Sequence, residues 1–262
     1  MHITMSKDKQ IRVFICVLLS FVVITFLTLV LGNLPIRTHA ESAVIINATC
    51  GVPTIDGNIS TIEWSDAATL TVQLITNPPV SPFTTTLYVM NSANHLYLGY
   101  TINDDELSPR AEFLSKGDAF ITNFDDDLSG SIYEFENNVI SLSAGVPQYD
   151  DSYIDADPVP SSSQSDIEGG GTMDGAGVAS RIDSLNHFEI SFPLCSGDTL
   201  DFCLHPDDVT GFRLEYLDAE ADESIGGSHL FPGTGGTSMA ELVIGNCSTV
   251  PDIFIYLPMV NR

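Results

Sequence analysis

Residues 84–100, TTTLYVMNSANHLYLGY, decide the fold, because they describe two strands joined by a short turn. In the second half, Leu96, Leu98 and Tyr100 fall on one face of a strand, since successive side chains of a strand alternate between its two faces. The residues between the two halves, 91–94 (NSAN), are typical of a hairpin loop. The stretch therefore predicts an antiparallel hairpin with one buried face.

The same alternation recurs along the rest of the chain. Apolar residues alternate again near residues 120–124, 188–192, 212–216 and 240–244, separated by clusters of Asn, Asp, Gly and Pro. This pattern predicts an all-β fold, an antiparallel β-sandwich of the jelly-roll or immunoglobulin-like kind, formed by one domain over residues 41–248. We expect residues 148–177, rich in Ser, Gly, Pro and Asp, to be a long surface loop. Residues 249–262 are expected to be a C-terminal tail or strand.

The N-terminus has the three parts of an export signal. The basic residues Lys7, Lys9 and Arg12 precede an uncharged run over residues 13–31, and a small residue, Ala40, stands at a plausible cleavage position. Residues 1–40 are therefore predicted to be a signal peptide or a signal anchor. We favour cleavage, because polar residues dilute the run, but its length is also sufficient to span a bilayer. In both cases the domain is expected outside the cell, secreted or held at the cell surface.

The remaining residues are strongly acidic. Beyond residue 40 the chain holds five basic and 34 acidic residues, a formal net charge of −29. Nucleic acid and anionic membrane surfaces are poor partners for such a chain, because both reward Lys and Arg. Divalent cations are suitable partners, although solubility alone explains most of these carboxylates.

Four cysteines follow the signal: Cys50, Cys195, Cys203 and Cys247. Four cysteines allow three pairings. We expect Cys195–Cys203, which would close a short loop, and Cys50–Cys247, which would tie the first strand to the last. A zinc site is the alternative, but the spacings do not resemble paired CxxC motifs.

Several separated segments together resemble family 9 carbohydrate-binding modules and the wider DOMON-like superfamily. They span about residues 43–246 and are PTIDGN (53–58), IEWSDAA (62–68), LYLGYTIND (96–104), GDAF (117–120), FDDD (124–127), YEF (133–135) and FEISFPL (188–194). The resemblance implies a non-catalytic module that binds polysaccharide or cell-wall glycan, in a family where calcium is common. Within the opening motif, Asp56, Gly57 and Trp64 are interpreted as structural: Gly57 suits a turn, and Trp64 is expected in the core.

The predicted metal site lies in the turn at residues 125–131, DDDLSGS. Oxygen ligands at alternate positions, Asp125, Asp127 and Ser129, can converge on calcium, and a plain acidic turn is the alternative reading. Glu136 falls at the twelfth position, as in an EF-hand loop. An extended chain over residues 131–136 would carry it about 16 Å away, however, so an EF-hand is not expected.

The other acidic runs, at residues 104–106 and 150–157, are interpreted as solvated loops. GxSxG, HExxH, P-loop and dinucleotide motifs do not occur in the sequence, and the chain is predicted not to be an enzyme.

The sugar-contacting residues stay unassigned by sequence. Family members that hold sugar clamp it between two tryptophans, whereas Trp64 is the single tryptophan here. Tyrosines could substitute through an apolar face and a polar tip. The candidates are Tyr97, Tyr149, Tyr153 and Tyr216.

Two further functions remain open. Some DOMON-like domains hold a b-type haem through Met and His, and Met90 with His187 or His229 is a conceivable pair. The other is a calcium-stiffened surface or adhesion module without affinity for sugar.

Overall fold

The computed structural model describes residues 44–76, 83–108, 117–125, 128, 136–143, 146–155, 162–218, 227–233 and 239–247. The predicted signal (1–40) and tail (249–262) lie outside this part of the chain. The described residues belong to one compact unit and are nearly all β. No helix in these ranges is long and apolar enough to cross a membrane.

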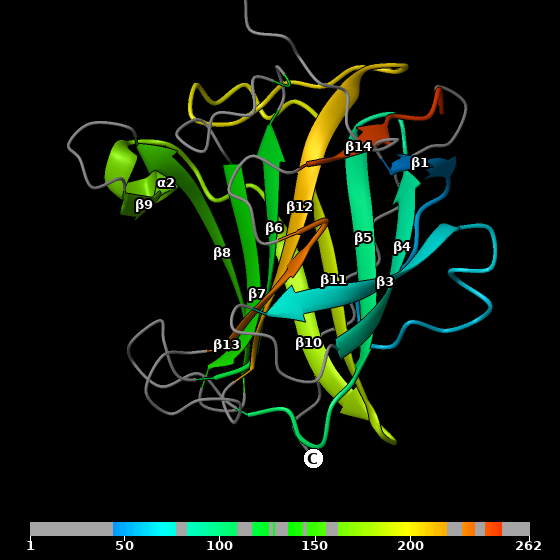
Figure 1. Cartoon of the computed structure of the whole chain (residues 1–262). Coiled ribbons are helices and arrows are strands. Elements are labelled where there is room, and N and C mark those ends of the chain that lie inside the picture. Colours follow the sequence, from blue (N-terminus) through cyan, green and yellow to red (C-terminus); the bar gives the residue numbers. More distant parts are fainter. Residues whose placement is uncertain are drawn as a thin grey trace, which may run out of the picture. The chain divides into compact units, whose positions relative to one another are not determined.

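The strands form two groups (Figure 1). The first group has the order β10-β11-β5-β4-β3. The short strand β2 pairs in parallel with the last two residues of β4. Its strands are β2 (Thr49–Cys50), β3 (Ala68–Thr76), β4 (Phe83–Asn91), β5 (His95–Asn103), β10 (Ala176–Ile182) and β11 (Leu185–Pro193).

The second group has the order β13-β12-β6-β7-β8-β9, with β14 beside β12 and β1 parallel to β14. Its strands are β1 (Ile45–Asn47), β6 (Ala119–Asp125), β7 (Glu136–Ser143), β8 (Val146–Asp155), β9 (Ser162–Ser165), β12 (Val209–Asp218), β13 (Gly227–Phe231) and β14 (Ala240–Val243). One helix, α2 (Asp166–Gly169), follows β9. A short pairing of β13 with β3 joins the two groups.

The two groups pack face to face as a β-sandwich, which confirms the predicted fold class. Leu98 and Tyr100 of β5 face Phe120 and Phe124 of β6 across a core in which all four are at most 2% exposed. The rings of Tyr100 and Phe120 stack with centroids 3.9 Å apart. The Tyr100 hydroxyl also shares a 2.6 Å hydrogen bond with the Thr122 hydroxyl, so the buried phenol has a polar partner. Burial of such large side chains is the main stabilising term of the fold.

The hairpin of residues 84–100 is present as β4 and β5, joined at Ser92–Asn94 as predicted. The expectation of a single buried face is wrong for β5. Tyr97, on the face opposite to Leu96 and Leu98, is 1% exposed and packs in a second cluster with Trp64. The segment between β2 and β3 covers this outer face, which period-two reasoning could not anticipate.

The expected long surface loop over residues 148–177 is also wrong. This stretch contains most of β8, the edge strand β9, α2 and the start of β10 (Figure 1). β8 pairs with β7 from Val146 to Tyr153, and Tyr149 is only 8% exposed. Polar composition was misleading, because Asp151 and Ser152 of β8 are buried although their side chains are polar.

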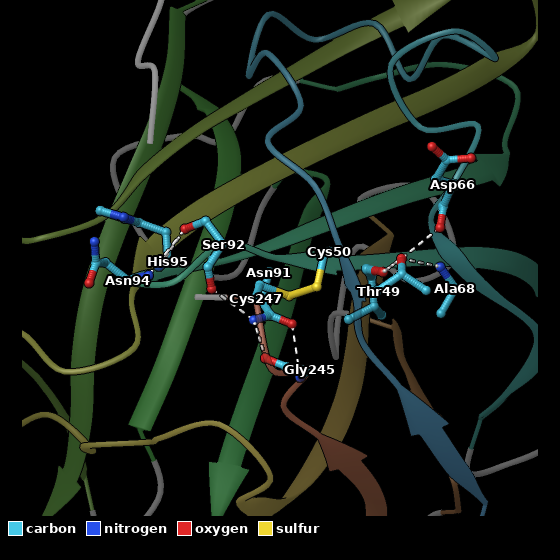
Figure 2. Close-up of a disulfide and its surroundings, with 11 residues drawn as sticks. Thr49, Cys50, Asp66, Ala68, Asn91, Ser92, Asn94, His95, Gly245 and Cys247 are labelled. Atoms are coloured by element: carbon cyan, nitrogen blue, oxygen red, sulfur yellow. Dashed lines mark hydrogen bonds between the residues drawn. A yellow bond between two sulfur atoms is a disulfide. The ribbon is translucent and has the colours of Figure 1, made fainter. Parts of the chain in front are cut away.

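Both expected disulfides are present. Cys50–Cys247 joins the end of β2 to the segment after β14, and Figure 2 shows Asn91 beside it. The Asn91 side chain donates to the Gly245 carbonyl at 2.8 Å and accepts from the Gly245 N–H at 2.9 Å. The bond and the amide therefore hold the C-terminal segment to β4.

The second disulfide, Cys195–Cys203, closes the loop that follows β11. Phe202, next to the bridge, packs its ring 5.2 Å from that of Phe124 and 5.6 Å from that of Phe192. The loop is thus anchored to the core at one end.

Candidate functional site

An open hollow lies where β5, the β10–β11 turn and the end of β12 meet. Its volume is about 590 Å³. The lining combines the apolar ring of Phe83 with six polar or charged residues: Asn103, Asp104, Asp105, Arg181, Ser184 and Asp218.

Strand register explains why these residues meet. β5 and β11 pair with Asn103 opposite Leu185, and β10 and β11 pair with Ile182 opposite Leu185. The turn between Ile182 and Leu185 needs Asp183 in the left-handed region, with φ of 55°, a conformation that Asp adopts more readily than most residues. The tight turn therefore places Arg181 and Ser184 beside the end of β5.

Arg181 is fixed in position by several hydrogen bonds. Its Nη2 donates to the carbonyl oxygens of Asp104 (2.9 Å) and Asp105 (2.8 Å), and its Nη1 donates to Asn186 Oδ1 (2.7 Å). The planar guanidinium thus holds the chain after β5 in one conformation, at the wall of the hollow.

The floor of the hollow is a buried carboxyl group. Asp104 is 8% exposed and accepts hydrogen bonds from the Tyr216 hydroxyl and from the Asp105 N–H at 2.7 Å. Its carboxyl lies within 4.8 Å of those of Asp118 and Asp218. Burial raises the pKa of Asp104, and the hydrogen bond from Tyr216 opposes that rise. The floor therefore carries concentrated negative charge or a retained proton.

The rim is accessible to a ligand. Asn103, Asp105 and Ser184 are exposed, so their amide, carboxylate and hydroxyl groups can exchange water for ligand hydroxyls. Phe83, partly buried with its ring 5.5 Å from that of Tyr216, supplies an apolar surface. A few placed polar groups around an apolar patch are typical of small-molecule sites.

Comparison with solved structures identifies the fold. The chain is similar to a family 9 carbohydrate-binding module from Caldicellulosiruptor kristjanssonii in complex with cellotriose, with a TM-score of 0.54, 14% identity, and coverage of 81% of this chain and 100% of that chain. The chain has the family 9 carbohydrate-binding module fold. For the complex of the Caldicellulosiruptor kristjanssonii module with glucose the TM-score is 0.55, with 14% identity over 80% of this chain and 98% of that one.

A third similar structure is that of a protein from Bacteroides uniformis described as a putative carbohydrate-binding protein. Its TM-score is 0.52, with 8% identity over 78% of this chain and 100% of that chain. No protein-family model matches the sequence, and no curated protein matches it. The family 9 resemblance inferred from separated motifs is thus confirmed at the level of fold.

Asp56, Gly57 and Trp64 form a buried network with Glu189 on the outer face of β11. Glu189, which is 0% exposed, accepts hydrogen bonds from the N–H groups of Asp56 (3.0 Å) and Gly57 (2.5 Å) and from Trp64 Nε1 (2.8 Å). Trp64 is 2% exposed, so its ring is not available to stack on a ligand. Gly57 has φ of 87°, and a Cβ there would lie 2.9 Å from Val178 Cγ1.

Three of the four tyrosines that we considered as sugar-clamping residues are buried. Tyr97, Tyr149 and Tyr216 are at most 8% exposed. Tyr153 is partly buried and its hydroxyl donates to Gln164 Oε1 at 3.2 Å. Of the four, Tyr216 contributes to the hollow, through its hydroxyl beneath Asp104.

The structure does not bring Met90 and His187 together. Met90 pairs with Tyr97, and Tyr97 pairs with Ser191, four residues along β11 from His187. His187 Nδ1 already accepts a hydrogen bond from the Ile59 N–H at 3.1 Å. His229 lies on β13, and its side chain is outside the described part.

The predicted calcium turn is only partly described. Asp125 ends β6 and is 1% exposed, while Asp127 and Ser129 lie outside the described residues. Calcium binding at Asp125, Asp127 and Ser129 remains a prediction.

Sequence reasoning missed the buried carboxylates. Asp104 and Asp151 belong to runs that we interpreted as solvated loops, yet they are 8% and 3% exposed. For Asp104 a signal existed: it directly follows a strongly apolar strand, so its side chain starts at the edge of the core.

Proposed function

We propose that this chain is an extracellular, non-catalytic carbohydrate-binding module that holds a glycan in the hollow lined by Asn103, Asp105, Arg181 and Ser184. The observation that carries the proposal is this hollow, on a fold shared with a module whose complexes contain cellotriose and glucose. The two disulfides support an oxidising, extracellular setting.

The chemistry of the hollow suits a sugar. Carboxylate and amide oxygens accept hydrogen bonds, and amide and guanidinium groups donate them, so neighbouring sugar hydroxyls find both kinds of partner. The apolar face of a pyranose ring can lie against Phe83. Because Arg181 is held by three hydrogen bonds, little order has to be created on binding.

A glycan panel tests the proposal. We expect the purified full chain to be retained by at least one β-glucan or other polysaccharide and to bind cellotriose in calorimetry. Asp105→Ala removes an exposed carboxylate from the rim without opening the core, and should weaken binding about tenfold, the effect of one lost charge-assisted hydrogen bond. Asp66→Ala, a change at another exposed aspartate, is the matched control and should bind normally.

Failure of the panel would favour the other reading. If neither calcium-loaded nor calcium-free protein binds any glycan, the chain is a surface or adhesion module without sugar affinity. If binding persists but Asp105→Ala and Asn103→Ala leave it unchanged, the hollow is not the site.

A further inference from the structure

A second group of carboxylates lies away from the hollow, between β8, α2 and the Cys195–Cys203 loop. Asp151 lies on β8, Asp166 begins α2, and Asp201 belongs to the loop closed by the disulfide. One carboxylate oxygen from each lies within 4.8 Å of those of the other two. We call these three residues the Asp151 cluster.

The cluster contains buried oxygens without hydrogen-bond partners. Asp166 is 0% exposed, and both of its carboxylate oxygens lack a partner. Asp151 is 3% exposed, and its Oδ1 also lacks one, as does the buried Oδ1 of Asp201. Most buried side-chain polar atoms in folded proteins have a hydrogen-bond partner, so several unpartnered carboxylate oxygens gathered in one place call for an explanation.

The surrounding charges do not supply that partner. The charges acting most strongly on Asp166 are those of Asp151, Asp201 and Asp198, all negative. Burial, together with the facing carboxyl groups of Asp201 and Asp151, raises the pKa of Asp166 to about 8.

Two further aspartates extend the cluster toward solvent. Asp174 and Asp198 each place a carboxylate oxygen within 4.8 Å of the other and of Asp201. Asp198 is held in place, because its carboxylate accepts from the N–H groups of Thr172 (2.6 Å) and Leu200 (3.0 Å).

The backbone also fits closely around this group. A Cβ on Gly171 would lie 2.5 Å from Asp198 Oδ2, so a side chain at this position would displace the Asp198 carboxylate. The disulfide closes the loop that carries Asp198 and Asp201 over only eight residues. Carboxylates from β8, the α2 region and a stapled loop thus converge at one place.

We propose that the Asp151 cluster binds one calcium ion, with Asp151, Asp166 and Asp201 as ligands. Calcium takes six to eight oxygen ligands in flexible geometry, and carboxylates are its preferred protein ligands. Asp174 and Asp198, on the solvent side, add negative charge that favours entry of the cation. The ion supplies the partner that the buried oxygens lack and offsets the repulsion among three carboxylates.

The donor set favours calcium over other metals. Zinc in proteins is bound mainly by sulfur and nitrogen, and the two cysteines nearest the cluster are joined in a disulfide. Magnesium requires near-ideal octahedral geometry, which three rigid carboxylates from separate segments do not impose.

Titration of the chelator-treated full chain with CaCl₂, and separately with MgCl₂, tests this site by calorimetry and thermal denaturation. We expect calcium to bind and to raise Tm by about 5–10 °C at a concentration 100 times Kd. Asp166→Asn should weaken calcium binding at least tenfold, since even outer-shell partners contribute about 10–100-fold to metal affinity. Without calcium this variant should melt at or near the wild-type temperature, because burial and the neighbouring carboxylates oppose ionisation of Asp166, and the neutral amide has a similar shape.

The last expectation separates loss of metal from loss of fold. Asp66→Asn makes the same change at an exposed position and should respond to calcium as the wild type does. An unchanged Tm of the wild type in calcium would overturn the proposal. So would a full calcium response in Asp166→Asn, and if that response disappears in Asp125→Asn instead, the ion binds at the hairpin turn.

Discussion

Replacement of Glu189 by glutamine should change how the stability of the domain depends on pH. Glu189 is 0% exposed, and its carboxylate accepts hydrogen bonds from the N–H groups of Asp56 and Gly57 and from Trp64 Nε1. Burial raises its pKa from the ordinary value of 4.5 to about 7, and the three donors only partly oppose that rise. Glutamine has nearly the same shape and does not titrate. Its NH2 group replaces one acceptor oxygen, a cost that does not change with pH.

The sign of the effect follows from proton binding. Between pH 4.5 and pH 7 the folded state keeps the Glu189 proton while the unfolded state has lost it, so the free energy of unfolding falls as pH rises. Above pH 7 both states are ionised and this contribution becomes constant. One pKa unit corresponds to about 1.4 kcal/mol, so the wild type should lose about 2–3 kcal/mol between pH 5 and pH 8 through this residue.

Urea denaturation of wild type and Glu189→Gln at pH 5, 6, 7 and 8, with chelator present, measures this loss. Other buried carboxyl groups titrate in both proteins, so the informative quantity is the difference between the two free energies of unfolding. We expect that difference to shift by about 2–3 kcal/mol in favour of glutamine over this range. Glu241→Gln, at a partly exposed position on β14, is the matched control. Parallel profiles for wild type and Glu189→Gln would refute the reasoning.

Three further predictions concern the disulfides and the opening turn. Replacing both Cys50 and Cys247 by serine should lower the free energy of unfolding by about 5 kcal/mol, the loop-entropy value for a separation of 197 residues, as measured by urea denaturation. Replacing Cys195 and Cys203 by serine should weaken calcium binding in calorimetry, because the loop carrying two of the five aspartates is released; unchanged affinity would contradict this role. Gly57→Ala should lower Tm, since φ of 87° and contact with Val178 both oppose a Cβ; an unchanged Tm would show that the turn can shift.

Local pattern predicted the strands of this fold well. The alternation in residues 84–100 and 212–216 reappears as β4, β5 and β12, because a buried sheet face imposes a period of two on the side chains. The motif series also indicated the family 9 fold at 14% identity. Of its described residues, Gly57 lies in a turn, and Trp64 and Phe188 are buried.

Long-range burial was beyond the reach of local pattern. Glu189 meets Asp56 across 133 residues, and nothing near either residue shows that a carboxylate will be enclosed there. Asp151 and Asp166 are likewise surrounded by Asp, Ser and Gly in sequence, a composition typical of exposed loops. Their burial depends on β8 pairing with β7 and on the stapled loop, which are tertiary facts.

A crystal structure of the full chain with cellotriose tests the central claim most directly. We predict that the sugar lies in the hollow, within hydrogen-bond distance of Asp105 and Arg181, with one ring against Phe83. A sugar bound at another surface, with the hollow filled by water alone, would contradict the account.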